Sequence, residues 1–374
     1  MIYPTAYSCW GNEEKAAISR VINSGQFTMG EEVAAFEAEL ASFHGRKYCI
    51  ATNSGSSANL IAVAALFHVK ERPLKRGDVA LVPSLAWSTT FAPLIQYGMG
   101  LALMDCDGGW NADIYDRRFD PKGARLVVGC SILGNPANLE AMNSVAGVLD
   151  AYFINDDCES LGARIDGATT GSFGLMATES FFFSHQISAN EGGAILTDDE
   201  ELAGLCRILR AHGWTRDVQP PTSFEEEYNF VAFGYNVRPL ELHAAVAREQ
   251  LKKLPKFIEE RCSNLYLFRR LTSDLPITHP DFNGNPSPFG LNFTLDGGRD
   301  ARRRLAVALR EAGIDCRLPT GGSFLRHPYG APWRAGQDTP RADLVHDTGM
   351  FLGNGPLNLT AEITEAVAIM RKVL

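Results

Sequence analysis

The sequence predicts an α/β protein: a large domain whose mostly parallel sheet is sandwiched by helices, and a smaller C-terminal α+β domain. From about residue 47 to residue 210, short apolar segments alternate with segments of helical periodicity. This alternation is typical of right-handed crossovers and a parallel sheet covered on both faces. The alternation stops near residue 240, and 374 residues exceed the ~250–300 at which single cores stop growing. We therefore place the large domain at 1–240 and the small domain at 241–374.

In the large domain, short apolar runs bounded by polar or glycine residues predict the strands. The expected strands are Tyr48–Ala51, Val79–Pro83, Gly100–Met104, Leu126–Ser131, Ala151–Asn155, Glu179–Phe183 and Gly193–Thr197. Apolar residues at helical spacing predict the helices between them. The expected helices are Ser56–Val69, Thr89–Tyr97, Leu139–Val145 and Asp199–Arg210.

In the small domain, one long helical pattern comes first and is followed by shorter elements. The expected elements are a helix from Glu241 to about Leu271, a strand at Phe289–Leu295, a helix at Ala301–Ala312, a strand at Asp315–Leu318 and a helix at Thr360–Leu374.

The formal charge of −9 argues against nucleic acid as a partner, because nucleic-acid-binding proteins usually show a basic face. No lysine or arginine cluster of that kind stands out in the sequence. An acidic protein can still bind a small anion through a few arginines and backbone N–H groups. The charge therefore leaves a nucleotide sugar open as a ligand.

The eight cysteines are scattered, without a C-x-x-C pair or the Cys/His spacing of a zinc or iron–sulfur site. We therefore expect reduced thiols and no metal centre. The N-terminus lacks a basic region followed by an apolar run, and no apolar stretch reaches the length of a membrane span. These features predict a soluble, cytoplasmic protein.

The segment from Asn53 to Asn59 (NSGSSAN) lies between an expected strand and an expected helix. Its small residues let the backbone approach a ligand, and the helix start offers free N–H groups and the positive end of a dipole. This suits a phosphate monoester. The alternative is a capped helix start, since serine is a favoured N-cap residue, and for this segment alone we favour it. The common phosphate motifs G-x-G-x-x-G and G-x-x-x-x-G-K-[ST] are absent.

Two further segments follow expected strands. Asp156 and Asp157 come at the carboxyl end of the strand 151–155, the place where open α/β sheets bind ligands. A carboxylate there can hold a pyridinium nitrogen protonated, although an acidic helix-capping turn explains it equally well. Trp87 follows the strand 79–83, where an exposed indole can stack on an aromatic ring. A core tryptophan is the default alternative.

His185 follows the aromatic run Phe181–Phe183 and precedes the turn Glu191-Gly192-Gly193. A lone histidine is usually structural. Its place at a strand end beside a Gly-Gly turn favours a functional role.

The order of these segments resembles the sugar aminotransferase (DegT/DnrJ/EryC1-like) family of fold-type-I pyridoxal phosphate enzymes. The resemblance covers nearly the whole chain. The stretches that carry it are Phe27–Gly30, Gly55–Ala58, Trp87–Thr90, Glu191–Gly193, Arg210–Gly213 and Gly234–Arg238.

The resemblance implies pyridoxal 5′-phosphate, or its pyridoxamine form, as the cofactor. The N–H groups of Gly55, Ser56 and Ser57, together with Ser180, would bind its phosphate.

The resemblance also implies contacts to the cofactor ring. Trp87 would stack on the pyridine ring and Asp156 would pair with its nitrogen, which makes the ring an electron sink. Glu159 falls where most relatives have glutamine near the ring hydroxyl. Asn236 would reach the cofactor of a neighbouring subunit, so the resemblance implies a homodimer with shared active sites.

One departure from the family pattern decides the expected reaction. Ordinary members carry a lysine, covalently linked to the cofactor, six residues before the glutamate of Glu-Gly-Gly; here that position is His185. The resemblance is then to the nucleotide-sugar 3-dehydratases of the family, lyases of dideoxysugar (colitose) and O-antigen biosynthesis. They remove the C3 hydroxyl of a 4-keto-6-deoxy sugar nucleotide, here GDP-4-keto-6-deoxy-D-mannose, with L-glutamate as amino donor.

Within this expectation, His185 is the general base, and Ser184, His212 and Arg238 contact the substrate. A second histidine-bearing group acts on CDP-sugars and carries an iron–sulfur cluster. Its cysteine cluster is missing here, which favours the first group.

Two alternatives remain. The chain could be an aminotransferase that works without a covalent lysine and releases an amino sugar. It could also be a catalytically inactive regulator that binds the cofactor or a sugar nucleotide. Release of ammonia and loss of the C3 oxygen separate the dehydratase from the first. A spectral change when glutamate is added to the cofactor-loaded protein separates it from the second.

Overall fold

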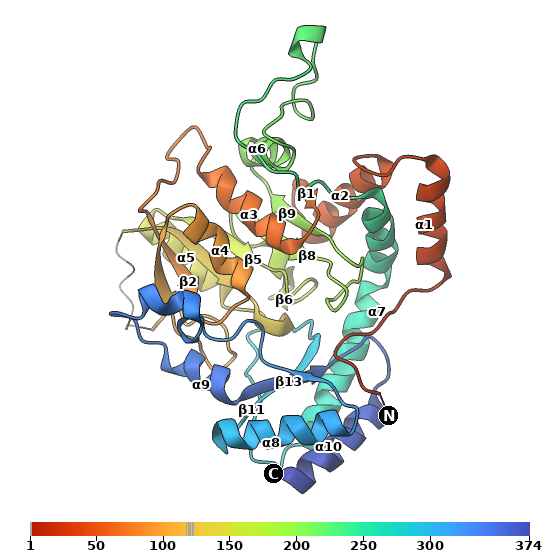
Figure 1. The fold of residues 1–374 in the computed structure, drawn as a ribbon, viewed down its shortest axis with the longest axis vertical. Coiled ribbons are helices and arrows are strands. Elements are labelled where there is room, and N and C mark those ends of the chain that lie inside the picture. Colours follow the sequence, from red (N-terminus) through yellow and green to blue (C-terminus); the bar gives the residue numbers. More distant parts are fainter. Residues whose placement is uncertain (1, 117, 119–120, 122) are drawn as a thin grey trace.

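Seven strands form the central sheet of the large domain in the computed structural model, which describes residues 2–116, 118, 121 and 123–374 (Figure 1). The strand order is β1-β9-β8-β5-β4-β2-β3. Their bounds are β1 Tyr48–Thr52, β2 Val79–Pro83, β3 Gly100–Met104, β4 Ala124–Cys130, β5 Tyr152–Asp156, β8 Met176–Ser180 and β9 Gly193–Thr197. β9 is antiparallel to β1 and β8, and the other neighbouring pairs are parallel. The mostly parallel sheet predicted from the sequence is confirmed.

Helices cover both faces of this sheet. Alternate residues of β1 show why: Ile50 belongs to the core beneath α3, whereas Cys49 and Ala51 belong to the core beneath α2. Within the described residues, no helix combines the length and apolarity that a bilayer crossing requires. The helices of this domain are α1 Asn12–Ser24, α2 Glu31–His44, α3 Gly55–Leu66, α4 Ser88–Gln96, α5 Leu139–Leu149 and α6 Glu200–Arg210. A two-stranded ribbon, β6 Arg164–Ile165 and β7 Ala168–Thr169, follows β5.

The small domain has a four-stranded antiparallel sheet in the order β10-β11-β13-β12. Its strands are β10 Ile277–Thr278, β11 Gly290–Leu295, β12 Cys316–Arg317 and β13 Gly349–Gly353, and its helices are α8 Gly298–Glu311, α9 Pro340–Thr348 and α10 Thr360–Val373. The N-terminal segment joins this core, because Tyr3 is fully buried in it and its hydroxyl donates to the Gly353 carbonyl at 2.7 Å. Both chain ends therefore lie at the small domain (Figure 1).

The long helix α7, Glu241–Leu271, runs between the two domains and has the bounds that the sequence predicted. Its first half contributes Ala244 and Leu254 to a core of the large domain. Its second half contributes Leu265 and Phe268 to the core of the small domain. A boundary at 240/241 remains a prediction, since one helix belongs to both cores.

One predicted strand was wrong in position. The sequence placed a strand at Glu179–Phe183, whereas β8 ends at Ser180 and the side chains of Phe182 and Phe183 are exposed. The aromatic run has high strand propensity, but the buried strand contains Thr178 and Glu179, whose polar side chains concealed it. The helices α1, α2 and α9 and the strand β13 were not anticipated.

Candidate active site

A cavity of about 370 Å³ opens where the carboxyl ends of β4, β5 and β8 meet the N-terminus of α3. This is the edge of the sheet at which α/β proteins bind ligands. Loops of the small domain form the opposite wall. Sequence-predicted residues that line the cavity are Gly55, Ser56, Trp87, Asp156, Glu159, Ser180, Ser184 and His185.

The start of α3 forms one end of the cavity. Ser54 is its N-cap, and its Oγ accepts from the Ser57 N–H at 3.1 Å. The N–H groups of Gly55 and Ser56 make no hydrogen bond to any described residue. A Cβ added to Gly55 would lie 2.6 Å from Ser180 Cβ, so only glycine lets the backbone pack here. The segment is thus a capped helix start that also leaves two donors facing a cavity, with Ser57 behind them.

Asp156 forms the floor of the cavity at the end of β5. Its Oδ2 accepts from Asn59 Nδ2 at 2.8 Å and from Thr90 Oγ1 at 2.7 Å, and its Oδ1 accepts only a longer bond, from the Cys158 N–H at 3.3 Å. Thr178 Oγ1 donates to the side-chain oxygen Oδ1 of Asn59 at 2.6 Å, which fixes the orientation of the Asn59 amide. Oδ2 thus already accepts two short hydrogen bonds. Oδ1 can accept a further hydrogen bond from a cationic N–H group.

Glu159 connects the two domains at the cavity. Its Oε2 accepts from the Leu133 N–H and its Oε1 from Thr320 Oγ1, both at 2.7 Å. Burial raises the pKa of this carboxyl to about 7. A substantial fraction of Glu159 is therefore protonated at neutral pH and can donate a hydrogen bond into the cavity.

His185 lies in the turn that follows β8 rather than in a strand. Its Nδ1 is 3.0 Å from Ser180 Oγ, and its ring packs edge-on to Phe289 with centroids 5.2 Å apart. Burial and, to a smaller extent, the positive charge of Arg261 together lower the pKa of the imidazole to about 4. Arg261 also donates to the His185 carbonyl at 2.9 Å, which anchors the turn. His185 is thus a neutral base at neutral pH.

Trp87 precedes α4 and its side chain lines the cavity while 54% exposed. That exposure argues against a core tryptophan and leaves the indole face available for a planar ring. Ser184 lines the same cavity beside His185.

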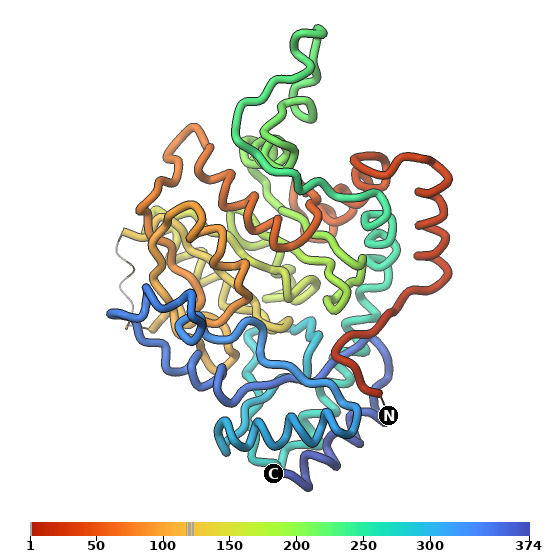
Figure 2. Tube along the Cα trace, in the orientation of Figure 1, coloured from red at the N-terminus to blue at the C-terminus, as the bar shows by residue number. Residues whose placement is uncertain are grey.

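Four predicted residues do not line this cavity: Ser57, which lies behind the start of α3, and three residues from another segment. Asn236, His212 and Arg238 lie near the ends of the segment between α6 and α7, where it is hydrogen-bonded to the large domain, and the middle of this segment projects from the body of the molecule (Figure 2). Arg238 Nη1 lies 2.6 Å from His212 Nε2, so these two side chains contact each other. Asn236 is exposed and pairs through its backbone with Ala211.

Several residues of the site were not predicted from the sequence. Asn59 and Thr90 hold Asp156, and Thr320 holds Glu159. Asn59 had a signal, because it is a buried polar residue three positions after Ser56 on an otherwise apolar helix. Thr320, like its neighbour Leu318, reaches the cavity only through packing of the small domain, which no local pattern reveals.

Comparison with known proteins identifies the family of this chain. The model of the DegT/DnrJ/EryC1/StrS aminotransferase family matches residues 8–371. The chain belongs to this family.

Members of the DegT/DnrJ/EryC1/StrS family include relatives similar over nearly the full length. GDP-4-keto-6-deoxy-D-mannose 3-dehydratase of Yersinia pseudotuberculosis is 39% identical over 387 residues, which cover 99% of this chain and 98% of that protein. A crystal structure of GDP-4-keto-6-deoxymannose-3-dehydratase, a histidine-to-asparagine variant with bound GDP-perosamine, matches with a TM-score of 0.93 and 38% identity over 98% of this chain and 100% of that one. A structure of the same enzyme with a trapped PLP-glutamate geminal diamine matches equally, again with a TM-score of 0.93, 38% identity and coverage of 98% and 100%.

Proposed function

We propose that this chain is a nucleotide-sugar 3-dehydratase that uses pyridoxal and pyridoxamine phosphate to remove the C3 hydroxyl of a 4-keto-6-deoxy sugar nucleotide. One observation carries the proposal. In a member of an aminotransferase family, the neutral imidazole of His185 stands in the cavity, and no lysine among the described residues lines it. A cofactor there is held without a covalent link to the chain. The base of the reaction is therefore His185, which cannot form the covalent link to the cofactor that a lysine forms.

The residues present fit the cofactor. The N–H groups of Gly55 and Ser56 and the hydroxyl of Ser180 gather at one end of the cavity, which suits a phosphate. The less engaged side of the Asp156 carboxylate suits a protonated ring nitrogen, and the exposed face of Trp87 suits the ring itself. Because these groups line one cavity of about 370 Å³, a single molecule can engage them together.

Pyridoxamine phosphate, when bound, supplies an amino group for the sugar C4 ketone and a ring that accepts electrons. His185 takes up the proton at the cofactor C4′ carbon, which a neutral imidazole can do, and delivers it to the departing C3 hydroxyl. Asp156 keeps the ring nitrogen protonated. Ser180 orients the imidazole through the contact to Nδ1, at 3.0 Å.

The substrate proposed is GDP-4-keto-6-deoxy-D-mannose, with L-glutamate as the amino donor. Support comes from the relatives of 38–39% identity, which bear that substrate in their name or were solved with a GDP-sugar or a glutamate adduct. The products would be a 4-keto-3,6-dideoxy sugar nucleotide, 2-oxoglutarate and ammonia.

We extend the proposal to a homodimer with shared sites. The segment 211–240 carries exposed apolar side chains that a monomer rarely leaves uncovered. These are Phe224, Tyr228, Phe230, Val231, Phe233 and Leu240, of which Phe233 is 98% exposed. Because Asn236, His212 and Arg238 lie on the same segment, a second copy packed there would receive them near its own cavity.

Two measurements test the reaction. The protein is incubated with cofactor, glutamate and a panel of 4-keto-6-deoxy nucleotide sugars, and the product is identified by mass. A product lighter by one oxygen atom, with ammonia and 2-oxoglutarate in equal amounts, supports the dehydratase; an amino sugar without ammonia release identifies an aminotransferase. His185→Asn should retain cofactor binding and lose dehydration, and full activity of that variant would refute the role of the imidazole.

Mixed dimers test the shared sites. Alone, subunits with His185→Asn should be inactive and subunits with Asn236→Ala weakly active, and their mixture should regain activity. The regained activity would come from the site that combines an intact His185 with an intact Asn236 from the other subunit. No recovery in a mixture shown to exchange subunits would mean that Asn236 does not act across an interface.

A further inference from the structure

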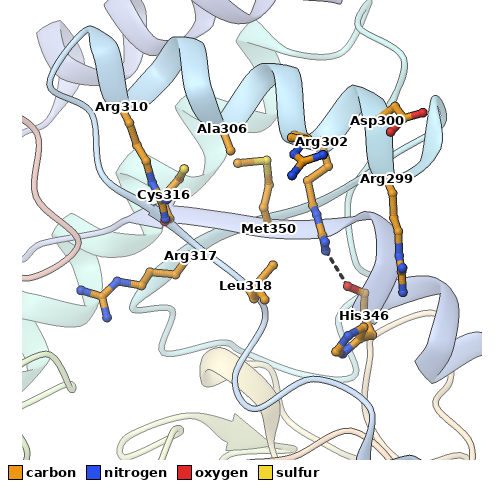
Figure 3. Close-up of a pocket in the computed structure, with 11 residues that line it drawn as sticks. Arg299, Asp300, Arg302, Ala306, Arg310, Cys316, Arg317, Leu318, His346 and Met350 are labelled. Atoms are coloured by element: carbon orange, nitrogen blue, oxygen red, sulfur yellow. Dashed lines mark hydrogen bonds between the residues drawn. The ribbon is translucent and has the colours of Figure 1, made fainter. Parts of the chain in front are cut away.

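A second cavity, of about 550 Å³, lies on the small domain between α8 and a wall formed by β12 with Leu318, the end of α9 and β13 (Figure 3). Five of its eleven lining residues are arginines, and its single carboxylate is Asp300. The five are Arg299, Arg302, Arg303, Arg310 and Arg317. This concentration of positive charge, in a chain of net charge −9, was not anticipated from the sequence.

The helix α8 presents its arginines to the cavity by their spacing. Arg302, Arg303 and Arg310 follow Arg299 by three, four and eleven residues, so the four share one face of the helix. Ala306 lies at the centre of this face, and its small side chain leaves the space between the guanidinium groups open. Eleven residues of helix extend about 16 Å, longer than a single phosphate group.

Most of this charge is not neutralised within the protein. Arg302 donates to the backbone carbonyls of His346 and Gly349, and Arg310 donates to the carbonyl of Cys316. Arg303 makes no hydrogen bond or ion pair with any described residue. Two of the five arginines have a carboxylate partner among the described residues: Arg299, with Asp347 at 2.5 Å, and Arg317, with Asp315 at 3.5 Å.

The guanidinium groups also affect one another. The pKa of Arg302 is lowered by burial and, next, by the positive charge of Arg299. Like charges held together in this way favour a bound anion, since an anion replaces repulsion by attraction. Planar guanidinium groups match phosphate oxygens in pairs, which makes phosphates better ligands here than carboxylates of the same charge.

We propose that this arginine cavity binds the diphosphate group of a nucleoside diphosphate. The size of the cavity and the length of its arginine row exceed what one phosphate needs. Arg317 and Leu318 line both this cavity and the candidate active site. The diphosphate can therefore come from the substrate, with its sugar at His185, or from a free nucleotide. The site itself does not depend on the proposed function; only the first source does.

Direct binding to the cofactor-loaded protein, without turnover, tests the site. Inorganic pyrophosphate and GDP are titrated by calorimetry at about 0.1 M salt, where distant charges are screened. Both should bind saturably, and Arg303→Gln should weaken both about tenfold or more, the loss of one charge-assisted contact. Arg303 makes no hydrogen bond or ion pair with any described residue, so this substitution should leave the melting temperature nearly unchanged.

Arg304→Gln is the matched control, because Arg304 is an exposed arginine on the same helix that does not line the cavity. It should change the affinity less than twofold. Absence of saturable pyrophosphate binding, or an equal loss in Arg303→Gln and Arg304→Gln, would overturn the site. Neither result bears on whether the protein dehydrates a sugar.

Kinetics identify the source of the diphosphate. If it belongs to the substrate, pyrophosphate competes with the sugar nucleotide, and Arg303→Gln raises KM with little change in kcat. If it belongs to a free nucleotide, pyrophosphate binds without raising KM for the sugar nucleotide. Both results support an anion site and assign it differently.

Discussion

Ser180 Oγ lies 3.0 Å from Nδ1 of His185 and also accepts from the Phe182 N–H at 3.4 Å. If the serine gives its proton to another oxygen, Nδ1 must carry the imidazole proton and donate to the serine. The Nε2 lone pair is then available in the cavity. Ser180 is thus a positioning residue that selects which imidazole nitrogen acts as the base.

Ser180→Ala should therefore lower kcat by about tenfold to a hundredfold, the contribution expected when a positioned base loses its orientation. Affinity for the cofactor should also fall. Ser184→Ala is the comparison, since Ser184 lines the same cavity without a hydrogen bond to the ring; it should raise KM for the sugar nucleotide and spare kcat. An unchanged kcat in Ser180→Ala at saturating cofactor would show that the serine does not position the imidazole.

The pKa of His185 in the cofactor-free protein should be found near 4 by NMR titration of the imidazole protons, because burial disfavours the cation. The spectrum of His185→Asn identifies the resonance. The folded-state pKa is below the usual 6.5, so the unfolded chain binds the extra proton between these values. Stability from this group is present above pH 6.5 and is lost as the pH falls toward 4. A midpoint near 6.5 would contradict the proposed environment.

Most of the sheet followed from the sequence, whereas half of the site did not. Strands β2, β3 and β9 are short apolar runs between turn residues, so local pattern defines them. The order of polar groups after strands located Asp156 and His185, because parallel strands bring their carboxyl ends to one edge. Thr320 depends instead on how the small domain packs against β5, a contact across 161 residues of chain. Periodicity carries no information about such a contact.

Glu159→Gln should change how stability depends on pH. The folded-state pKa of Glu159 is about 7 against a usual 4.5, so the folded protein holds a proton that the unfolded chain releases between these values. The wild type therefore loses up to about 3 kcal/mol as the pH rises from 4.5 to 7. Gln does not titrate. In urea unfolding, the free energy of unfolding of the variant should therefore rise relative to that of the wild type from pH 5 to pH 8. Parallel pH profiles of the two proteins would exclude this assignment.

Glu241 joins the start of α7 to the start of α2. Its Oε1 accepts from the N–H groups of Gly30 and Val33, at 2.8 and 2.9 Å, and its Oε2 accepts from the Glu32 N–H at 2.9 Å. The carboxylate thus satisfies three N–H groups at the positive end of the helix dipole, and it is nearly fully buried. A Cβ at position 30 would lie 2.5 Å from Gln26 Nε2 and 2.9 Å from Glu241 Oε2, so a side chain there would displace one or both of these groups.

Glu241→Ala should destabilise the protein by about 3 kcal/mol, because it leaves one buried and two partly buried N–H donors without this partner. Glu241→Gln should cost less, since its amide oxygen still accepts. Glu259→Ala is the control: that exposed carboxylate lies on the same helix, makes no ion pair with any described residue, and should change stability by less than about 0.5 kcal/mol. Equal urea midpoints for Glu241→Ala and Glu259→Ala would mean that the start of α2 is held by its packing on α7 and not by this carboxylate.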